Sequence, residues 1–187
     1  MLVQQKKITV EEFLRMDFPD DDAYYELING EIVKKSAPNP RHQYVSIQLS
    51  RSLLQHVSSK KLGEVFTAPI DVFLSDVTKV QPDIIFVSTP NSHIIDYDNG
   101  IIGTPDLTVE IISPSSVTRD RLDKMAAYEA ASVKEYWIID PNNRTFEIYK
   151  LDGTELKIHD FKAEEGSVES KLLTGFVCDL GGLFPGK

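Results

Sequence analysis

The fold is decided by two apolar runs, Val80-Gln81-Pro82-Asp83-Ile84-Ile85-Phe86-Val87 and Leu107-Thr108-Val109-Glu110-Ile111-Ile112. Each has the length and composition of a buried strand, and each carries a carboxylate. A carboxylate in such a strand costs free energy unless a metal or a cation compensates its charge. A helix that carries Lys124 follows, and then the run Glu135-Tyr136-Trp137-Ile138-Ile139-Asp140-Pro141. The stretch therefore indicates a site for a divalent metal with a lysine beside it.

Length and composition indicate one globular domain that spans residues 1–187, large enough for a substantial core. The hydrophobic fraction is 41% and the charged fraction 26%, which are ordinary values. Cys178 is the single cysteine, so no intramolecular disulfide forms, as is usual in a reducing cytoplasm. We find no signal peptide and no apolar run near the roughly 20 residues that a membrane helix needs. We therefore expect a cytoplasmic protein without membrane contact.

The formal net charge of −9 argues against a protein that coats nucleic acid, because such a protein needs a basic surface. The charge does not exclude an enzyme that acts on nucleic acid. Carboxylates of a metal site add to the negative count, and bound divalent ions offset part of it.

The N-terminal third predicts two helices and a hairpin. Thr9-Val10-Glu11-Glu12 has capping-box spacing and predicts a helix to about Met16. Asp20-Asp21-Asp22 is typical of a solvated turn. Asn29-Gly30 predicts a hairpin between strands at Tyr24–Ile28 and Glu31–Lys35. Asn39-Pro40 predicts the start of a second helix.

The remainder predicts a sheet with one further helix. We expect strands at Glu64–Leu74, Val80–Val87, Leu107–Ser113, Glu135–Ile139, Thr145–Leu151, Glu155–Phe161 and Ser167–Leu173, a polar loop at Thr89–Thr104, and a helix at Thr118–Ala131. The predicted fold class is α/β, with a mixed β-sheet flanked by helices and preceded by a helix and a β-hairpin.

Each carboxylate in the two runs has an ordinary alternative. Asp83 follows Pro82, and a strand-entry turn explains this pair about as well as a ligand does. Glu110 lies among apolar residues without a turn signal, so a solvated position is the weaker interpretation. Asp106 would lie about 13 Å from Glu110 along an extended strand, too far to share one ion with it. Asp83 is therefore the better partner for Glu110.

Three other residues are weaker candidates when taken alone. Lys124 fits an exposed i,i+4 pair with Asp120, but its helix should pack over the sheet just after the Glu110 strand. In the strand Tyr24–Ile28, alternation places Glu26 on the same face as Tyr24. The ordinary interpretation is a polar residue on the outer face of the strand, and a carboxylate of the metal site is the second interpretation. His42 lies in the first turn of a helix, where an exposed histidine is unremarkable and a supporting polar role is the alternative.

Competing chemistries find no support in the sequence. There is no Cys/His spacing for zinc, no glycine-rich phosphate loop and no nucleophile elbow. Oxygen ligands without histidine pairs favour magnesium or manganese. Because two carboxylates at one site repel each other, we expect Asp83→Asn to keep or raise the stability of the metal-free protein.

Several segments, in order along nearly the whole chain, resemble the Uma-two family of bacterial endonucleases. The matching segments are Tyr25–Glu31, Pro40–His42, Gln81–Val87, Pro105–Ser115, Asp120–Tyr128, Val133–Pro141 and Thr174–Phe176. This family belongs to the PD-(D/E)xK nuclease-like superfamily. The resemblance implies a restriction-endonuclease-like fold and metal-dependent hydrolysis of phosphodiester bonds, with DNA as the expected substrate.

The resemblance also implies the site residues, which are Glu26, Asp83, Glu110 and Lys124 as catalytic residues. In the superfamily the lysine stands two residues after the acid, where this chain has Ile112. The family pattern moves the lysine to the following helix, at Lys124. Asp83, Glu110, the Ile111 carbonyl and Glu26 would hold Mg²⁺ or Mn²⁺, with His42 in support.

Two matters stay open at this point. The displaced lysine and the acidic charge also fit a catalytically inactive nuclease-fold module that binds nucleic acid or protein, and RNA is a further possible substrate. Cutting both strands of a duplex favours a two-fold homodimer. The segment Leu180–Phe184 is a candidate contact for it, although a core anchor is the stronger interpretation of those residues.

Overall fold

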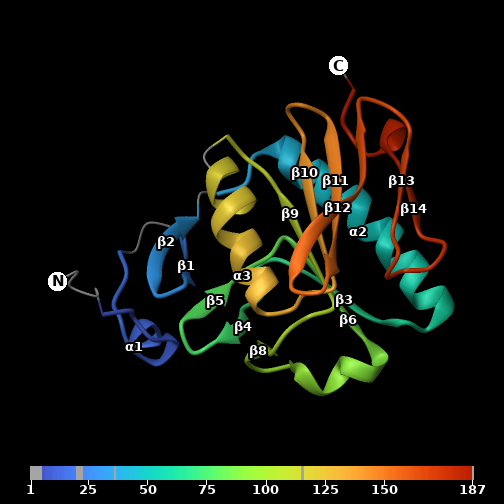
Figure 1. Cartoon of the computed structure of the whole chain (residues 1–187). Helices are drawn as coiled ribbons and strands as arrows, with labels where there is room; N and C mark the ends of the chain where they lie inside the picture. Colours follow the sequence, from blue (N-terminus) through green and yellow to red (C-terminus); the bar gives the residue numbers. More distant parts are fainter. Residues whose placement is uncertain (1–5, 20–22, 36, 115, 187) are drawn as a thin grey trace.

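The structure is a computed structural model that describes residues 6–19, 23–35, 37–114 and 116–186, so the turn expected at Asp20–Asp22 lies outside the described residues (Figure 1). Its helices are α1 (Val10–Leu14), α2 (Pro40–Lys60) and α3 (Met125–Ala130), with shorter 3₁₀ or π segments η1 (Thr89–Ile94), η2 (Arg119–Lys124) and η3 (Leu180–Gly182). Its strands are β1 (Tyr24–Ile28), β2 (Glu31–Lys35), β3 (Gly63–Thr67), β4 (Val72–Ser75), β5 (Thr78–Val80), β6 (Ile84–Ser88), β7 (Ile95–Asp96), β8 (Gly100–Ile102), β9 (Leu107–Ile111), β10 (Glu135–Asp140), β11 (Thr145–Asp152), β12 (Glu155–Ala163), β13 (Ser167–Glu169) and β14 (Val177–Asp179).

The local signals of the N-terminal third form as predicted. Thr9 caps α1 in a capping box with Glu12, and Asn39 caps α2, whose first residue is a proline. Asn29 and Gly30 both have positive φ, 51° and 83°, which suits the tight turn between β1 and β2. A Cβ at position 30 would lie 2.6 Å from the Lys7 Cβ, so this glycine is also required by close packing.

Most strands belong to two six-stranded sheets. One has the order β2-β1-β5-β4-β8-β7, and the other has the order β12-β11-β10-β9-β6-β3. In the second sheet β9 and β10 are parallel and the other pairs are antiparallel, so this sheet is mixed as predicted. A small third sheet pairs β13 with β14.

The second sheet is covered on both faces (Figure 1). Residues of α2 pack with one set of strand side chains, which includes Phe86 and Val109. The alternate set, which includes Ile85 and Ile138, packs with the α3 side chain Tyr128. Since successive side chains of a strand face opposite ways, Glu110 turns toward the α3 face rather than toward α2.

Two predicted strands are each divided by a proline, which cannot donate a ladder hydrogen bond. Residues 64–74 form the ends of β3 and β4 on either side of Pro69, and residues 80–87 form β5 and β6 on either side of Pro82. At Gln81-Pro82-Asp83 the chain therefore crosses from one large sheet to the other. The prediction of continuous strands is wrong here.

Smaller differences concern boundaries. The predicted loop at 89–104 contains η1, β7 and β8, and the helix predicted at 118–131 is π-helical from Arg119 to Lys124 before it becomes α3. The strand predicted at 167–173 ends at Glu169. π-helical turns are rare and are frequent at functional sites, which draws attention to η2.

The C-terminal segment is part of the core. Leu180, Leu183 and Phe184 are buried in the cluster that also contains α2. The core-anchor interpretation of this segment is confirmed, and its apolar side chains are not exposed for a dimer contact. In the described ranges, no helix combines the length and apolarity that a membrane crossing requires.

Candidate active site

Asp83 lies where the chain enters β6, and three groups compensate its charge. Its carboxylate accepts hydrogen bonds from the backbone N–H of Ile111 at 2.7 Å and from Lys35 Nζ at 3.0 Å, and His42 Nε2 lies 3.1 Å away. Burial would raise the pKa of Asp83, but Lys35 and His42 outweigh burial and lower the pKa below its ordinary value. Asp83 is therefore ionised at neutral pH.

Glu110 lies on β9 next to that strand entry, and its side chain is almost fully buried. Its Oε1 accepts hydrogen bonds from Lys124 Nζ at 2.8 Å and from the Tyr128 hydroxyl at 2.7 Å. Burial raises the pKa of Glu110 to about 7, against the opposing effects of Lys124 and Lys35. Glu110 therefore changes its charge near neutral pH.

Lys124 joins Glu110 to Glu26. Its Nζ lies 2.8 Å from Glu26 Oε1 as well as 2.8 Å from Glu110 Oε1, and its side chain has no exposed surface. Burial alone would lower the pKa of Lys124, but the charges of Glu110 and Glu26 raise it above its ordinary value. The interpretation of Lys124 as an exposed i,i+4 partner of Asp120 is wrong, because η2 faces the sheet.

Glu26 is also fully buried, so its interpretation as a polar residue on an outer face is wrong. Its Oε1 accepts a second hydrogen bond from the Gln81 N–H at 2.7 Å, at the crossing between the sheets. Its Oε2 is buried without a hydrogen-bond partner among the described residues. His42 is buried too, so the exposed interpretation of this histidine does not hold either.

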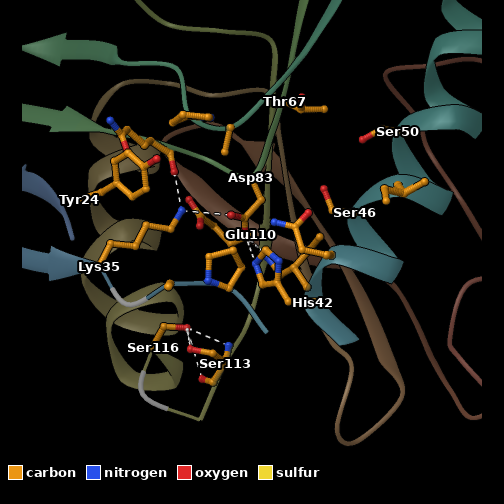
Figure 2. Close-up of a pocket in the computed structure, with 18 of the residues that line it drawn as sticks. Tyr24, Lys35, His42, Ser46, Ser50, Thr67, Asp83, Glu110, Ser113 and Ser116 are labelled. Carbon is orange, nitrogen blue, oxygen red and sulfur yellow. Dashed lines mark hydrogen bonds and ion pairs between the residues drawn. The ribbon is translucent and has the colours of Figure 1, made fainter. Parts of the chain in front are cut away.

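Asp83 and Glu110 open onto one cavity of about 570 Å³ (Figure 2). Basic side chains line the same cavity, among them Lys35 and His42 beside Asp83 and Arg119 near Asp120. The remaining wall includes the α2 residues Gln43, Ser46, Ile47, Ser50, Arg51 and Leu54. Glu26 and Lys124 do not line the cavity and lie behind Glu110. The structure thus gathers the four predicted residues but gives only two of them access to a ligand.

The other carboxylates of the quoted runs are structural. Asp106 accepts hydrogen bonds from the Ser88 N–H and from Lys134 Nζ, away from the cavity. Glu135 accepts hydrogen bonds from Trp137 Nε1 and from the segment at Ser170 that closes the core. Asp140 caps the turn into β11. A charge at the end of an apolar run is thus an ambiguous signal.

Lys35 and Tyr128 are the site residues that sequence reasoning missed. Lys35 ends a hairpin strand directly after another lysine, and nothing local in the sequence separates the partly buried lysine from the exposed one. Tyr128 stands four residues after Lys124, so the helical stripe that they share was the available signal.

The donor atoms at the cavity suit a hard divalent cation such as Mg²⁺. Magnesium is commonly held by one or two carboxylates and keeps several waters, and this site supplies Asp83 and Glu110. Across residues 6–19, 23–35, 37–114 and 116–186, no group of three or more His, Cys, Asp or Glu side chains is arranged to hold a metal. The fit is therefore to an open site completed by water or substrate, not to a closed structural site.

Comparison with protein families matches residues 10–181 to the Uma2 family, described as "Putative restriction endonuclease". The match covers most of the chain, and the chain belongs to this family. No curated protein matches the sequence.

Two of the solved structures that are similar to this chain are a putative nuclease and a restriction endonuclease. One is the crystal structure of a "putative nuclease belonging to DUF820" from Anabaena variabilis ATCC 29413, with a TM-score of 0.75 and 20% identity over 95% of this chain and 97% of that chain. The other, the type IIG restriction endonuclease BpuSI, gives a TM-score of 0.38 and 16% identity over 60% of this chain and 11% of that chain, which is too low to support an argument. The first likeness confirms the predicted restriction-endonuclease-like fold, and the family supports a nuclease function.

Proposed function

We propose that this chain is a metal-dependent endonuclease that hydrolyses phosphodiester bonds in DNA. One observation carries the proposal: Asp83 and Glu110, buried carboxylates at adjacent strands β6 and β9, line one cavity together with basic side chains. Buried carboxylates that open onto a cavity are the usual setting of metal-assisted hydrolysis. The nuclease family supports the same reaction class.

In this proposal Asp83, Glu110 and the Ile111 carbonyl hold Mg²⁺ or Mn²⁺. When bound, the ion supplies a water of lowered pKa and offsets charge on the phosphoryl oxygens. His42 fixes the orientation of the Asp83 carboxylate, because its Nε2 meets Oδ2 while the Ile111 N–H meets the same oxygen. The polar lining of the cavity would orient the substrate phosphate.

Lys124 acts through Glu110 in this account. Its Nζ is sealed from the cavity, so it holds the Glu110 carboxylate in place and does not contact the substrate. Glu26 in turn positions Lys124 through the ion pair between its Oε1 and Lys124 Nζ. A role of Glu26 as a direct or water-mediated metal ligand remains a prediction; its Oε2 has no hydrogen-bond partner among the described residues, but the side chain does not line the cavity.

Helix α2 explains how an acidic protein would dock DNA. This 21-residue helix has no acidic residue and carries Arg41, Arg51 and Lys60, although the whole chain has a net charge of −9. Arg51 lines the cavity, and Arg41 is exposed about three turns before it, in the first turn of the helix. Basic side chains beside a phosphodiester site neutralise backbone phosphates.

We further propose a homodimer, which would place two such sites on a duplex.

One observation favours the rival function of a binding module that does not cut. Lys35 already pairs with Asp83, and Lys124 already pairs with Glu110, so both carboxylates have cationic partners without a metal. Such a module would bind nucleic acid or protein through the same cavity and need no ion.

The experiment that separates the two functions incubates the purified protein with duplex DNA, single-stranded DNA and RNA, each with Mg²⁺, with Mn²⁺ and with EDTA. We expect cleavage of DNA with either ion and none with EDTA. Binding to any of these substrates without cleavage under all conditions would favour the module, and selective cleavage of RNA would change the substrate class.

A further inference from the structure

Lys35 contacts one oxygen of the Asp83 carboxylate, and both residues line the cavity. Its Nζ lies 3.0 Å from Asp83 Oδ1 and 2.7 Å from the Gln81 carbonyl oxygen. The other oxygen of Asp83, Oδ2, is engaged by His42 and by the Ile111 N–H. Oδ1 is therefore the carboxylate oxygen that pairs with the ammonium group of Lys35.

The two lysines of the site differ in access to ligands. The Lys35 side chain keeps 16% of its surface exposed and lines the cavity, whereas the Lys124 side chain keeps none and lies behind Glu110. Lys35 lies at the end of β2, and within the described part of the chain its side chain makes two polar contacts, both at its tip. Lys35 is thus the lysine that can leave one carboxylate and meet a ligand in the cavity.

A divalent ion at Asp83 meets a like charge on the same carboxylate, and like charges at close range disfavour each other strongly in a partly buried site. The ion binds only if the ammonium group moves. An ammonium group displaced from Oδ1 remains in a cavity that would hold a substrate phosphate, and an ammonium ion is a common partner of phosphate.

We propose that Lys35 is an internal counter-ion of Asp83 that competes with the metal and, once displaced, contacts the substrate phosphate. This inference rests on the proposed function and deepens it. In this proposal the lysine that contacts the substrate is Lys35, on the hairpin strand β2. Lys124 is a positioning residue that holds Glu110. The counter-ion role of Lys35 also explains why Asp83 has a cationic partner in the metal-free protein.

The test measures Mn²⁺ binding by isothermal titration calorimetry and by the metal-induced change in Tm. Lys35→Met removes the charge and keeps the length of the side chain. Lys34→Met is the matched control, since Lys34 is the exposed neighbour on the opposite face of the same strand. Lys35→Arg keeps the charge and reports on folding.

For Lys35→Met we expect a lower Tm without metal, a Kd for Mn²⁺ that is lower by about tenfold, and slower DNA cleavage at saturating Mn²⁺. Lys34→Met and Lys35→Arg should bind Mn²⁺ as the wild type does. If the wild type binds Mn²⁺ and Lys35→Met binds it no more tightly, competition is wrong. If Lys35→Met binds more tightly but cleaves as fast as the wild type, the phosphate contact is wrong. A wild type without any Mn²⁺ binding would overturn the proposed function itself.

Discussion

Lys124 Nζ lies 2.8 Å from Glu110 Oε1, although the pair is separated by 14 residues that include the connection from strand to helix. The same nitrogen lies 2.8 Å from Glu26 Oε1, so one buried cation joins β1, β9 and η2. The buried carboxylates of two strands, β1 and β9, therefore depend on one lysine of η2 for charge compensation.

Replacement of Lys124 should destabilise the protein more than replacement of an ordinary surface lysine. Lys124→Met leaves two buried carboxylates without their cation, and we expect a loss of about 3 kcal/mol or more in the free energy of unfolding. Urea denaturation followed by circular dichroism measures it. Lys157→Met, at an exposed position, is the control. A loss below about 1 kcal/mol for Lys124→Met would show that the pair contributes little.

Asp83→Asn should lower the stability of the metal-free protein. From the repulsion between two carboxylates we expected this substitution to keep or raise the stability. In the structure, however, Lys35 and His42 contact Asp83, and the pKa of Asp83 is lowered. The neutral amide leaves Lys35 without an anionic partner and changes the contact with His42, at a cost of about 2 kcal/mol. The variant should also lose the rise in Tm that Mn²⁺ causes. Unchanged or raised stability of Asp83→Asn would contradict this account and would indicate that repulsion between the two carboxylates dominates.

The stability of the metal-free protein should depend on pH through Glu110. Its pKa is raised to about 7 in the fold, so the folded state holds a proton that the unfolded state has released, and stability falls as pH rises toward 7. Asp83 and Glu26 have lowered pKa values and act only in the acid range. Tm measured between about pH 5 and pH 8 should fall less steeply in Glu110→Gln than in the wild type. Identical slopes would contradict the assignment.

Arg51 should contribute to DNA affinity through a phosphate contact. For Arg51→Ala we expect weaker binding to duplex DNA of any sequence and a salt dependence reduced by about one counterion. Fluorescence anisotropy at several salt concentrations, in Ca²⁺ to prevent cleavage, measures both quantities. Lys157→Ala removes a charge far along the chain, on β12, and should change neither. Equal effects of the two substitutions would indicate a non-specific influence of net charge.

The sequence predicted those parts of the fold that rest on local rules. The capping box at Thr9, the turn at Asn29-Gly30 and the apolar run that forms β9 are local patterns, and each formed as expected. The division of two strands at Pro69 and Pro82 follows from proline chemistry, but the long apolar runs around them obscured it.

The site was predictable only in part, because burial is a tertiary property. Glu110 stood out as a charge inside an apolar strand, whereas Glu26 and Lys124 looked like surface residues on elements that can be exposed. Lys35 had no local signal, since its contact with Asp83 spans 48 residues and depends on two sheets that meet at Gln81. Contacts between residues so far apart in the sequence arise from tertiary packing and cannot be predicted from local sequence patterns.

The most direct test of the central claim is nicking and linearisation of supercoiled plasmid in Mg²⁺ or Mn²⁺, with the wild type beside Asp83→Ala and Glu110→Ala. Asp106→Asn, at a buried carboxylate away from the cavity, is the matched control. The account predicts cleavage by the wild type and the control, with at least a hundredfold slower cleavage, roughly 3 kcal/mol in the barrier, for the two alanine variants. Equal cleavage by all four proteins, or none by any of them with either ion, would contradict it.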